Sequence, residues 1–208
     1  KSARRYIYLE AQYLTASPVR RLLAKSLAAK RGPEVVILAN KWSRGLLERF
    51  AMGGNGERVM RSLRQADFHN RLRIYHPVVQ DGDGSCDVSV HSKLTIVDDR
   101  LLRIGSANLN NRSMGLDSEC DLVIEARDKR GQQAVAGIRD RLLAEHLAVT
   151  PDDISEAIAH TGSLIRAIET YNRSSRGLRP FPEKDLQGPT EPLPLTQFLD
   201  PSRPLKLF

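Results

Sequence analysis

The stretch V-H-S-K-L-T-I-V-D-D-R-L-L-R-I-G-S-A-N, residues 90–108, decides how the rest of the chain is interpreted. Its two apolar runs are separated by a short polar turn, which is typical of a β-hairpin. His91 and Lys93 alternate with apolar residues, so on a strand both side chains point to one face. A two-residue loop would place Ser106 and Asn108 on that face, about 5 Å across the hairpin. A three-residue loop would reverse the parity and separate them.

The residue types in this patch suit phosphate chemistry. A histidine side chain can act as nucleophile or as acid near neutral pH, so His91 could attack phosphorus or give a proton to a leaving alkoxide. Lys93 and Asn108 can hold the non-bridging oxygens of a phosphate. Glu119, shortly downstream, could accept the second imidazole N–H of His91 and fix its tautomer. Taken singly, each is more often an ordinary surface or turn residue, but the combined pattern is rare in sequences of average composition.

Asp98 is predicted to have a different role from these residues. It lies at the far end of the strand from His91, too distant to orient the imidazole ring. We therefore expect it to tie the turn by hydrogen bonds or by an ion pair with an arginine. No cluster elsewhere has the spacing of metal ligands, so neither a metal nor another cofactor is expected.

Composition limits the possible partners and compartments. The chain has 208 residues, enough for one domain with a full core, and a net charge of +7. This excess fits an anionic partner, whether a phosphodiester, a nucleic acid or an acidic lipid surface. The two cysteines predict free thiols, and a cytoplasmic or peripheral membrane location is favoured. The sequence starts at Lys1 rather than Met, which suggests a piece of a longer protein.

The order of apolar segments predicts the fold class. Residues 6–9 are expected to form a strand, and a helix follows. The nearly continuous apolar run at 34–40 is typical of a strand that is covered on both faces. We therefore predict an α/β fold, with a mixed β-sheet flanked by helices on both faces. The predicted division is a catalytic unit over 1–150, a C-terminal helix over 151–175 and an irregular Pro-rich tail over 176–208.

Residues 91–98 (H-S-K-L-T-I-V-D) with 105–108 (G-S-A-N) resemble the HKD motif of the phospholipase D superfamily. The segment 104–119 is similar to the one that follows the second HKD motif of true phospholipases D. Y-I-Y-L-E-A-Q-Y at 6–13 and R-L-L-A-E-H-L at 141–147 resemble flanking parts of the same half. The resemblance covers about residues 5–148 and implies the C-terminal half of a phospholipase D or transphosphatidylase.

The resemblance also implies a role for each residue of the motif. His91 would be one of two active-site histidines, serving as general acid and base. The other implied members are the phosphate ligands Lys93 and Asn108, the supporting residues Ser106, Gly105 and Asp98, and Glu119 behind the histidine. The implied reaction proceeds through a phosphohistidine and needs no metal.

The chain departs from the two-motif pattern because it carries a single HKD motif. The remaining histidines, His69, His76, His146 and His160, do not supply a second one. The chain is therefore expected either to be half of a two-motif enzyme, with low activity alone, or to complete its site as a homodimer. Expected partners are a phospholipid, a transient membrane surface and the missing HKD half.

Several functions remain open at this point. The leading hypothesis is a phosphodiesterase that hydrolyses or transphosphatidylates glycerophospholipids. The alternatives are a homodimeric nuclease, for which nucleic acid would be the partner, and a cardiolipin-synthase-like phosphatidyltransferase. A non-catalytic scaffold is disfavoured by the intact set of polar residues.

Overall fold

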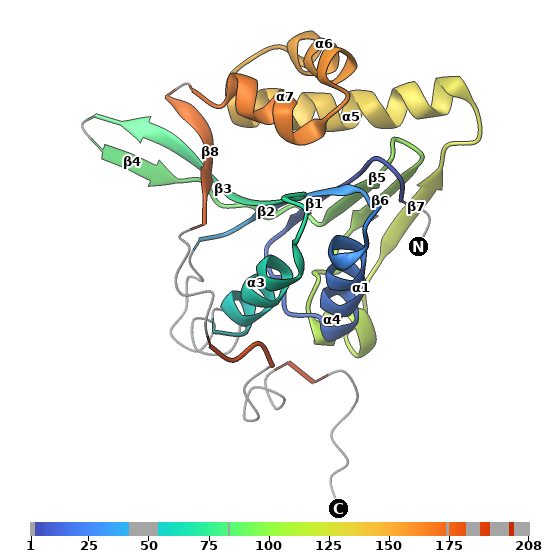
Figure 1. Ribbon diagram of the computed structural model, residues 1–208, viewed down its shortest axis with the longest axis vertical. Coiled ribbons are helices and arrows are strands. Elements are labelled where there is room, and N and C mark those ends of the chain that lie inside the picture. The colour runs from blue at the N-terminus through green and yellow to red at the C-terminus, as the bar shows by residue number, and fades with distance from the viewer. Residues whose placement is uncertain are drawn as a thin grey trace, which may run out of the picture.

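The computed structural model describes residues 3–41, 54–82, 84–173, 175–181, 188–191 and 200–201. These residues form one mixed β-sheet with helices on both of its faces (Figure 1). The predicted fold class is therefore confirmed.

The sheet has a parallel centre and antiparallel flanks. Its order is β4-β3-β2-β1-β5-β6-β7, and β8 also pairs with β3. The strands are β1 (Tyr6–Ala11), β2 (Glu34–Ala39), β3 (Leu72–Asp81), β4 (Gly84–Asp87), β5 (Leu94–Val97), β6 (Leu101–Gly105), β7 (Asp121–Glu125) and β8 (Arg176–Pro180). Strand β2 is parallel to β1 and β3, whereas β5, β6 and β7 continue the sheet in antiparallel fashion. After Glu34 the residues of β2 are apolar and buried, as expected for a strand that is covered on both faces.

A layer of helices covers each face of the sheet (Figure 1), and a separate hydrophobic core lies between each layer and the sheet. The helices are α1 (Ser17–Ala28), α3 (Gly54–Ala66), α4 (Asn111–Gly115), α5 (Lys129–Leu147), α6 (Pro151–Thr161) and α7 (Leu164–Tyr171). Alternation along β1 divides its side chains between the cores: Tyr6 and Tyr8 pack with α5, α6 and α7, while Leu9 and Ala11 pack with α1 and α3.

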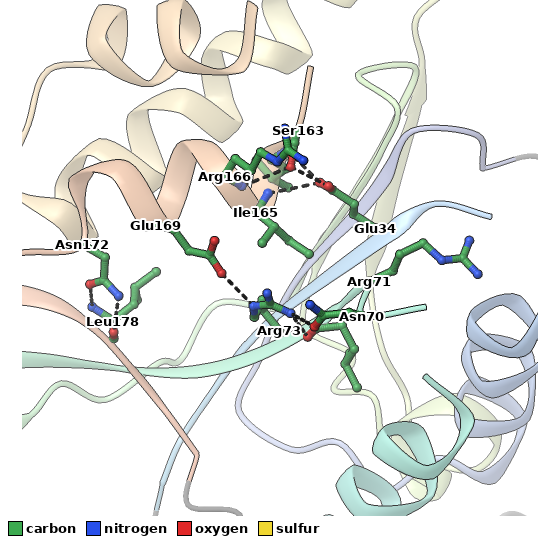
Figure 2. Close-up of polar contacts among 12 residues, drawn as sticks. Glu34, Asn70, Arg71, Arg73, Ser163, Ile165, Arg166, Glu169, Asn172 and Leu178 are labelled. Atoms are coloured by element: carbon green, nitrogen blue, oxygen red, sulfur yellow. Dashed lines mark hydrogen bonds and ion pairs between the residues drawn. The ribbon is translucent and has the colours of Figure 1, made fainter. Parts of the chain in front are cut away.

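The predicted single helix over 151–175 is in fact two helices, α6 and α7. Helix α6 begins with a capping box between Thr150 and Asp153 and ends at Gly162 in the left-handed conformation. Helix α7 is held to β2 by Glu34, whose carboxylate accepts hydrogen bonds from Ser163 Oγ at 2.5 Å and Leu164 N at 2.8 Å (Figure 2). A carboxylate at a helix N-terminus pairs with otherwise unsatisfied N–H groups, which explains why the helix starts there.

The predicted start of the irregular tail also needs correction. Residues Arg176–Pro180 form β8, which pairs with β3 in the main sheet. The Asn172 side chain holds this strand by two hydrogen bonds (Figure 2): its Oδ1 accepts from Leu178 N at 2.7 Å, and its Nδ2 donates to Leu178 O at 2.6 Å. Farther along, Asp200 is buried and accepts a hydrogen bond from Thr15 Oγ1 at 2.7 Å. Part of the tail thus packs on the domain beyond its last strand.

Candidate functional site

The central hairpin has a three-residue loop, so the expectation based on a two-residue loop was wrong. Leu94 pairs with Ile104 and Val97 with Leu101, which leaves 98–100 in the turn. The parity argument for Ser106 and Asn108 therefore does not hold. In addition, His91 and Lys93 precede the first residue of β5 and lie in a non-strand segment. What gathers the polar residues is the packing of this segment on neighbouring strand ends.

Asn40 and Glu10 anchor the segment that carries the motif. The Asn40 side chain accepts from Val90 N at 2.7 Å and donates to Val90 O at 3.0 Å. Ser92 Oγ donates to the carboxylate of Glu10, which lies near the end of β1. Asn40 and Glu10 both lie at carboxyl ends of parallel strands, where ligand sites of α/β sheets commonly form.

Lys93 is buried, whereas His91 is exposed. The Lys93 ammonium donates to the backbone oxygen of His91 at 2.7 Å and to Gln12 Oε1 at 3.3 Å. Burial lowers the pKa of Lys93, and the negative charge of Glu119 acts in the opposite direction. This cation has lost part of its hydration, and its hydrogen-bond acceptors among the described residues are neutral oxygens, so an anionic oxygen would be a favourable further partner.

Ser106 and Glu119 form the other side of the candidate site. Ser106 Oγ donates to Glu119 Oε2 at 2.5 Å and accepts from Cys120 N at 3.0 Å. Within the described residues this hydrogen bond of Glu119 goes to Ser106 and not to His91. The pairing of Glu119 with His91 therefore stays a prediction.

Gly105 and Asn108 complete the predicted set. A Cβ atom on Gly105 would overlap Cys120 O and the side chain of Asp121, so glycine permits the close approach of β6 and β7. Asn108 Oδ1 is buried and has no hydrogen-bond partner within the described residues. An unpaired buried amide oxygen costs about 1–3 kcal/mol, and such costs are often tolerated at functional sites.

Asp98 ties the start of β1 rather than the turn alone. Its carboxylate accepts from the backbone N–H groups of Arg4, Arg5 and Tyr6 at 2.7, 2.8 and 2.9 Å. Asp98 therefore makes hydrogen bonds, but they hold another strand and not the turn that the sequence interpretation expected. The neighbouring Asp99 makes the arginine pair instead, with Arg139 Nη1 2.5 Å from its Oδ1.

The sequence interpretation missed Glu10, Gln12, Asn40 and Ser92. The E-A-Q run at the end of the first strand, 10–12, was the available signal, because strand ends favour ligand sites. His146, which supplies no second HKD motif, has its Nε2 3.3 Å from Glu10 Oε1.

Metal-ligand clusters and membrane-spanning helices are both absent from the described part of the chain. No group of three or more His, Cys, Asp or Glu there is placed to hold a metal ion. No helix among the described residues is long and apolar enough to cross a membrane. Cys86 and Cys120 are free and exposed, as predicted.

Comparison with known proteins gives consistent results. Residues 1–140 match the family described as "Cardiolipin synthase, PLD-like domain". The chain is 38% identical over 98 residues to phospholipase D zeta 2 of Arabidopsis thaliana, a match that covers 41% of this chain and 9% of the relative. It is 39% identical over 100 residues to phospholipase D of Phytophthora infestans, covering 41% of this chain and 6% of that protein. The matches thus span less than a tenth of these relatives.

Solved structures with a similar chain course were also found. Nuc of Salmonella typhimurium, titled a phospholipase D family member, gives a TM-score of 0.46 at 23% identity, over 68% of this chain and 80% of that one. Phosphatidylserine synthase of Haemophilus influenzae gives 0.47 at 18% identity, over 68% of this chain and 32% of that one.

Proposed function

This chain belongs to the phospholipase D superfamily, in its cardiolipin synthase, PLD-like domain family, and from that premise we propose that it supplies one half of a phosphodiesterase site. The proposed substrate is a glycerophospholipid, cleaved by water or transferred to another alcohol. The observation that carries the proposal is a buried Lys93 that donates to the backbone oxygen of the exposed His91 and whose pKa responds to the charge of Glu119, the partner of Ser106.

In the proposed first step, a histidine of the facing half attacks phosphorus while His91 protonates the leaving alcohol oxygen. The phosphorus–oxygen ester bond breaks, and a phosphorus–nitrogen bond forms. In the second step, His91 removes the proton from water or from an acceptor alcohol, whose oxygen displaces the histidine nitrogen. The alcohol product and the phosphoryl product leave, and both histidines return to their starting protonation states.

The residues around His91 would stabilise charge during both steps. The Lys93 ammonium and the Asn108 amide would bind the non-bridging oxygens, on which negative charge grows at a five-coordinate phosphorus. Glu119 would stabilise the imidazolium form of His91 once the substrate has ordered the ring, with Ser106 fixing the carboxylate.

The site also requires a facing half with its own HKD motif, and the exposed edge of the sheet is where we propose that it docks. Strand β7 lies at this edge (Figure 1) and leads directly from Glu119. Leu122 and Val123 are 59% and 58% exposed, and Ile104 beside them is 45% exposed. An apolar strand edge exposes backbone groups that lipid cannot pair, so a protein partner fits it better than a membrane.

A second candidate function is cleavage of nucleic acid by a homodimer. The net charge of +7 favours this alternative, since phosphate backbones attract basic proteins. A cardiolipin-synthase-like phosphatidyl transfer, which the family description suggests, differs from the leading proposal only in the acceptor alcohol.

The test compares the protein and its His91→Ala variant on phosphatidylcholine vesicles with ethanol, and on plasmid DNA. Each is assayed alone and as the parent polypeptide that contains the facing half. We expect phosphatidylethanol from the parent and none from its variant. Cleavage of DNA alone would contradict the lipid proposal, and activity that survives in the variant would remove His91 from the mechanism.

A further inference from the structure

A buried carboxylate lies directly behind the segment that carries His91 and Lys93. Glu10 is 2% exposed, and its neighbours along β1, Tyr8 and Leu9, are buried as well. One oxygen accepts from Tyr8 OH at 2.5 Å, and the same oxygen lies 3.3 Å from His146 Nε2 on α5. The other oxygen accepts from Ser92 Oγ. A carboxylate is rarely buried without such a set of partners.

The electrostatics of Glu10 indicate that it remains ionised. Burial by itself would raise its pKa, but hydrogen bonds and charge from His146, together with the hydroxyls of Ser92 and Tyr8, leave the pKa below its usual value. Hydrogen bonds to a charged, desolvated acceptor are among the stronger ones in proteins. The Ser92 bond to Glu10 is therefore able to fix the local backbone.

Other hydrogen bonds to that backbone are isolated ones, such as those from Val88 N to Pro77 O at 2.8 Å and from Gly105 N to Lys93 O at 3.2 Å. Residues 88–93 form no strand, so they lack the ladder of hydrogen bonds that would align a strand residue. The contacts that hold them include the Asn40 side chain at Val90 and the Glu10 carboxylate at Ser92. Since Ser92 lies between His91 and Lys93 in the chain, its hydrogen bond to Glu10 restrains the peptide groups on both sides of it.

We propose that Glu10, backed by His146, is a positioning residue that holds Ser92 so that His91 and Lys93 present their side chains to phosphate. This inference rests on the proposed function, because it concerns the orientation of the same site. Neither Glu10 nor His146 reaches the substrate in this proposal. Their effect passes through the backbone on both sides of Ser92.

The test uses Ser92→Ala and Ser92→Thr, with Ser163→Ala as the matched control. Ser163 Oγ also donates to a carboxylate of the sheet, that of Glu34, at 2.5 Å. Both carboxylates lie on the face of the sheet that α5, α6 and α7 cover. Inorganic phosphate is titrated into each protein while the imidazole resonances of His91 are followed by NMR. We expect Ser92→Ala to weaken the affinity about tenfold, a loss of one hydrogen bond, and Ser92→Thr to stay within about twofold of the original protein.

Hydrogen exchange at the amides of residues 91–93 provides a readout that does not depend on phosphate. It should be about tenfold faster in Ser92→Ala and unchanged in Ser163→Ala and Ser92→Thr. Equal exchange rates in the two alanine variants would overturn the positioning role. If the original protein binds no phosphate at His91 but the exchange rates differ as expected, the proposed function fails while the anchoring stands.

Discussion

Replacing Asp98 with asparagine is predicted to destabilise the chain by weakening the start of β1. The change keeps the shape of the side chain and its tolerance of the positive φ of 53° at this position. One oxygen would still accept from Arg5 and Tyr6, but the new amide would face the N–H of Arg4, so two donors would meet. Loss of one charge-assisted bond and weakening of two others gives about 2–3 kcal/mol in the free energy of unfolding.

Urea denaturation at pH 7, followed by circular dichroism, measures this loss through the midpoint and the slope of the transition. Asp128→Asn is the matched control, because Asp128 caps α5 with a single bond to Gly131 N at 2.7 Å. Asparagine caps helices about as well as aspartate, so the control should lose less than about 0.5 kcal/mol. An Asp98→Asn loss no larger than that of the control would refute the anchoring of β1 by Asp98.

Three further changes test other parts of the structure. Lys93→Met should reduce phosphate affinity at least about tenfold in an NMR titration. The free energy of unfolding in urea should change by less than about 1 kcal/mol, because the variant no longer has to bury a cation. A full-affinity Lys93→Met variant would exclude Lys93 as a phosphate ligand. Burial raises the pKa of Asp99 from 3.8 to about 7, so the folded chain keeps a proton that the unfolded chain loses, and stability declines as pH rises between these values. In urea titrations, Asp99→Asn should reduce the loss of free energy of unfolding between pH 5 and pH 8 by about 2 kcal/mol. This is less than the pKa difference alone would give, because Arg139 compensates part of the Asp99 charge. An unchanged decline would contradict the burial of Asp99 as its cause. Gly105→Ala should cost about 2–4 kcal/mol by calorimetry, since its Cβ would overlap Cys120 and Asp121, and a neutral result would show that β7 can move away.

The fold class could be predicted from the sequence because the positions of apolar residues along a strand or helix show which of its faces are buried. The run at 34–40 is apolar on both faces, and β2 is buried on both faces in the centre of the sheet. Strand β8 has no such pattern. Its five residues, R-G-L-R-P, form a strand because β3 offers them an unpaired edge. Tertiary pairing of this kind leaves little trace in local sequence.

The site residues stay a prediction, and the local geometry of their hairpin could not be predicted from the sequence. The three-residue loop depends on Asp98 and Asp99, which both adopt positive φ angles, 53° and 56°. Aspartate tolerates that conformation without requiring it, so the loop length was not readable from the sequence. The contact of Lys93 with Gln12 joins residues far apart in the chain, and hydrophobic periodicity carries no signal for it.

The most direct test of the central claim locates phosphate on the chain. Inorganic phosphate is titrated into the isotopically labelled protein, and chemical-shift changes are mapped onto the described residues. We expect the changes to cluster at His91, Lys93, Ser106, Asn108 and Glu119, and to vanish in Lys93→Met. Changes centred on α5, α6 and α7 instead, or changes that persist in Lys93→Met, would contradict a phosphodiesterase half-site at this hairpin.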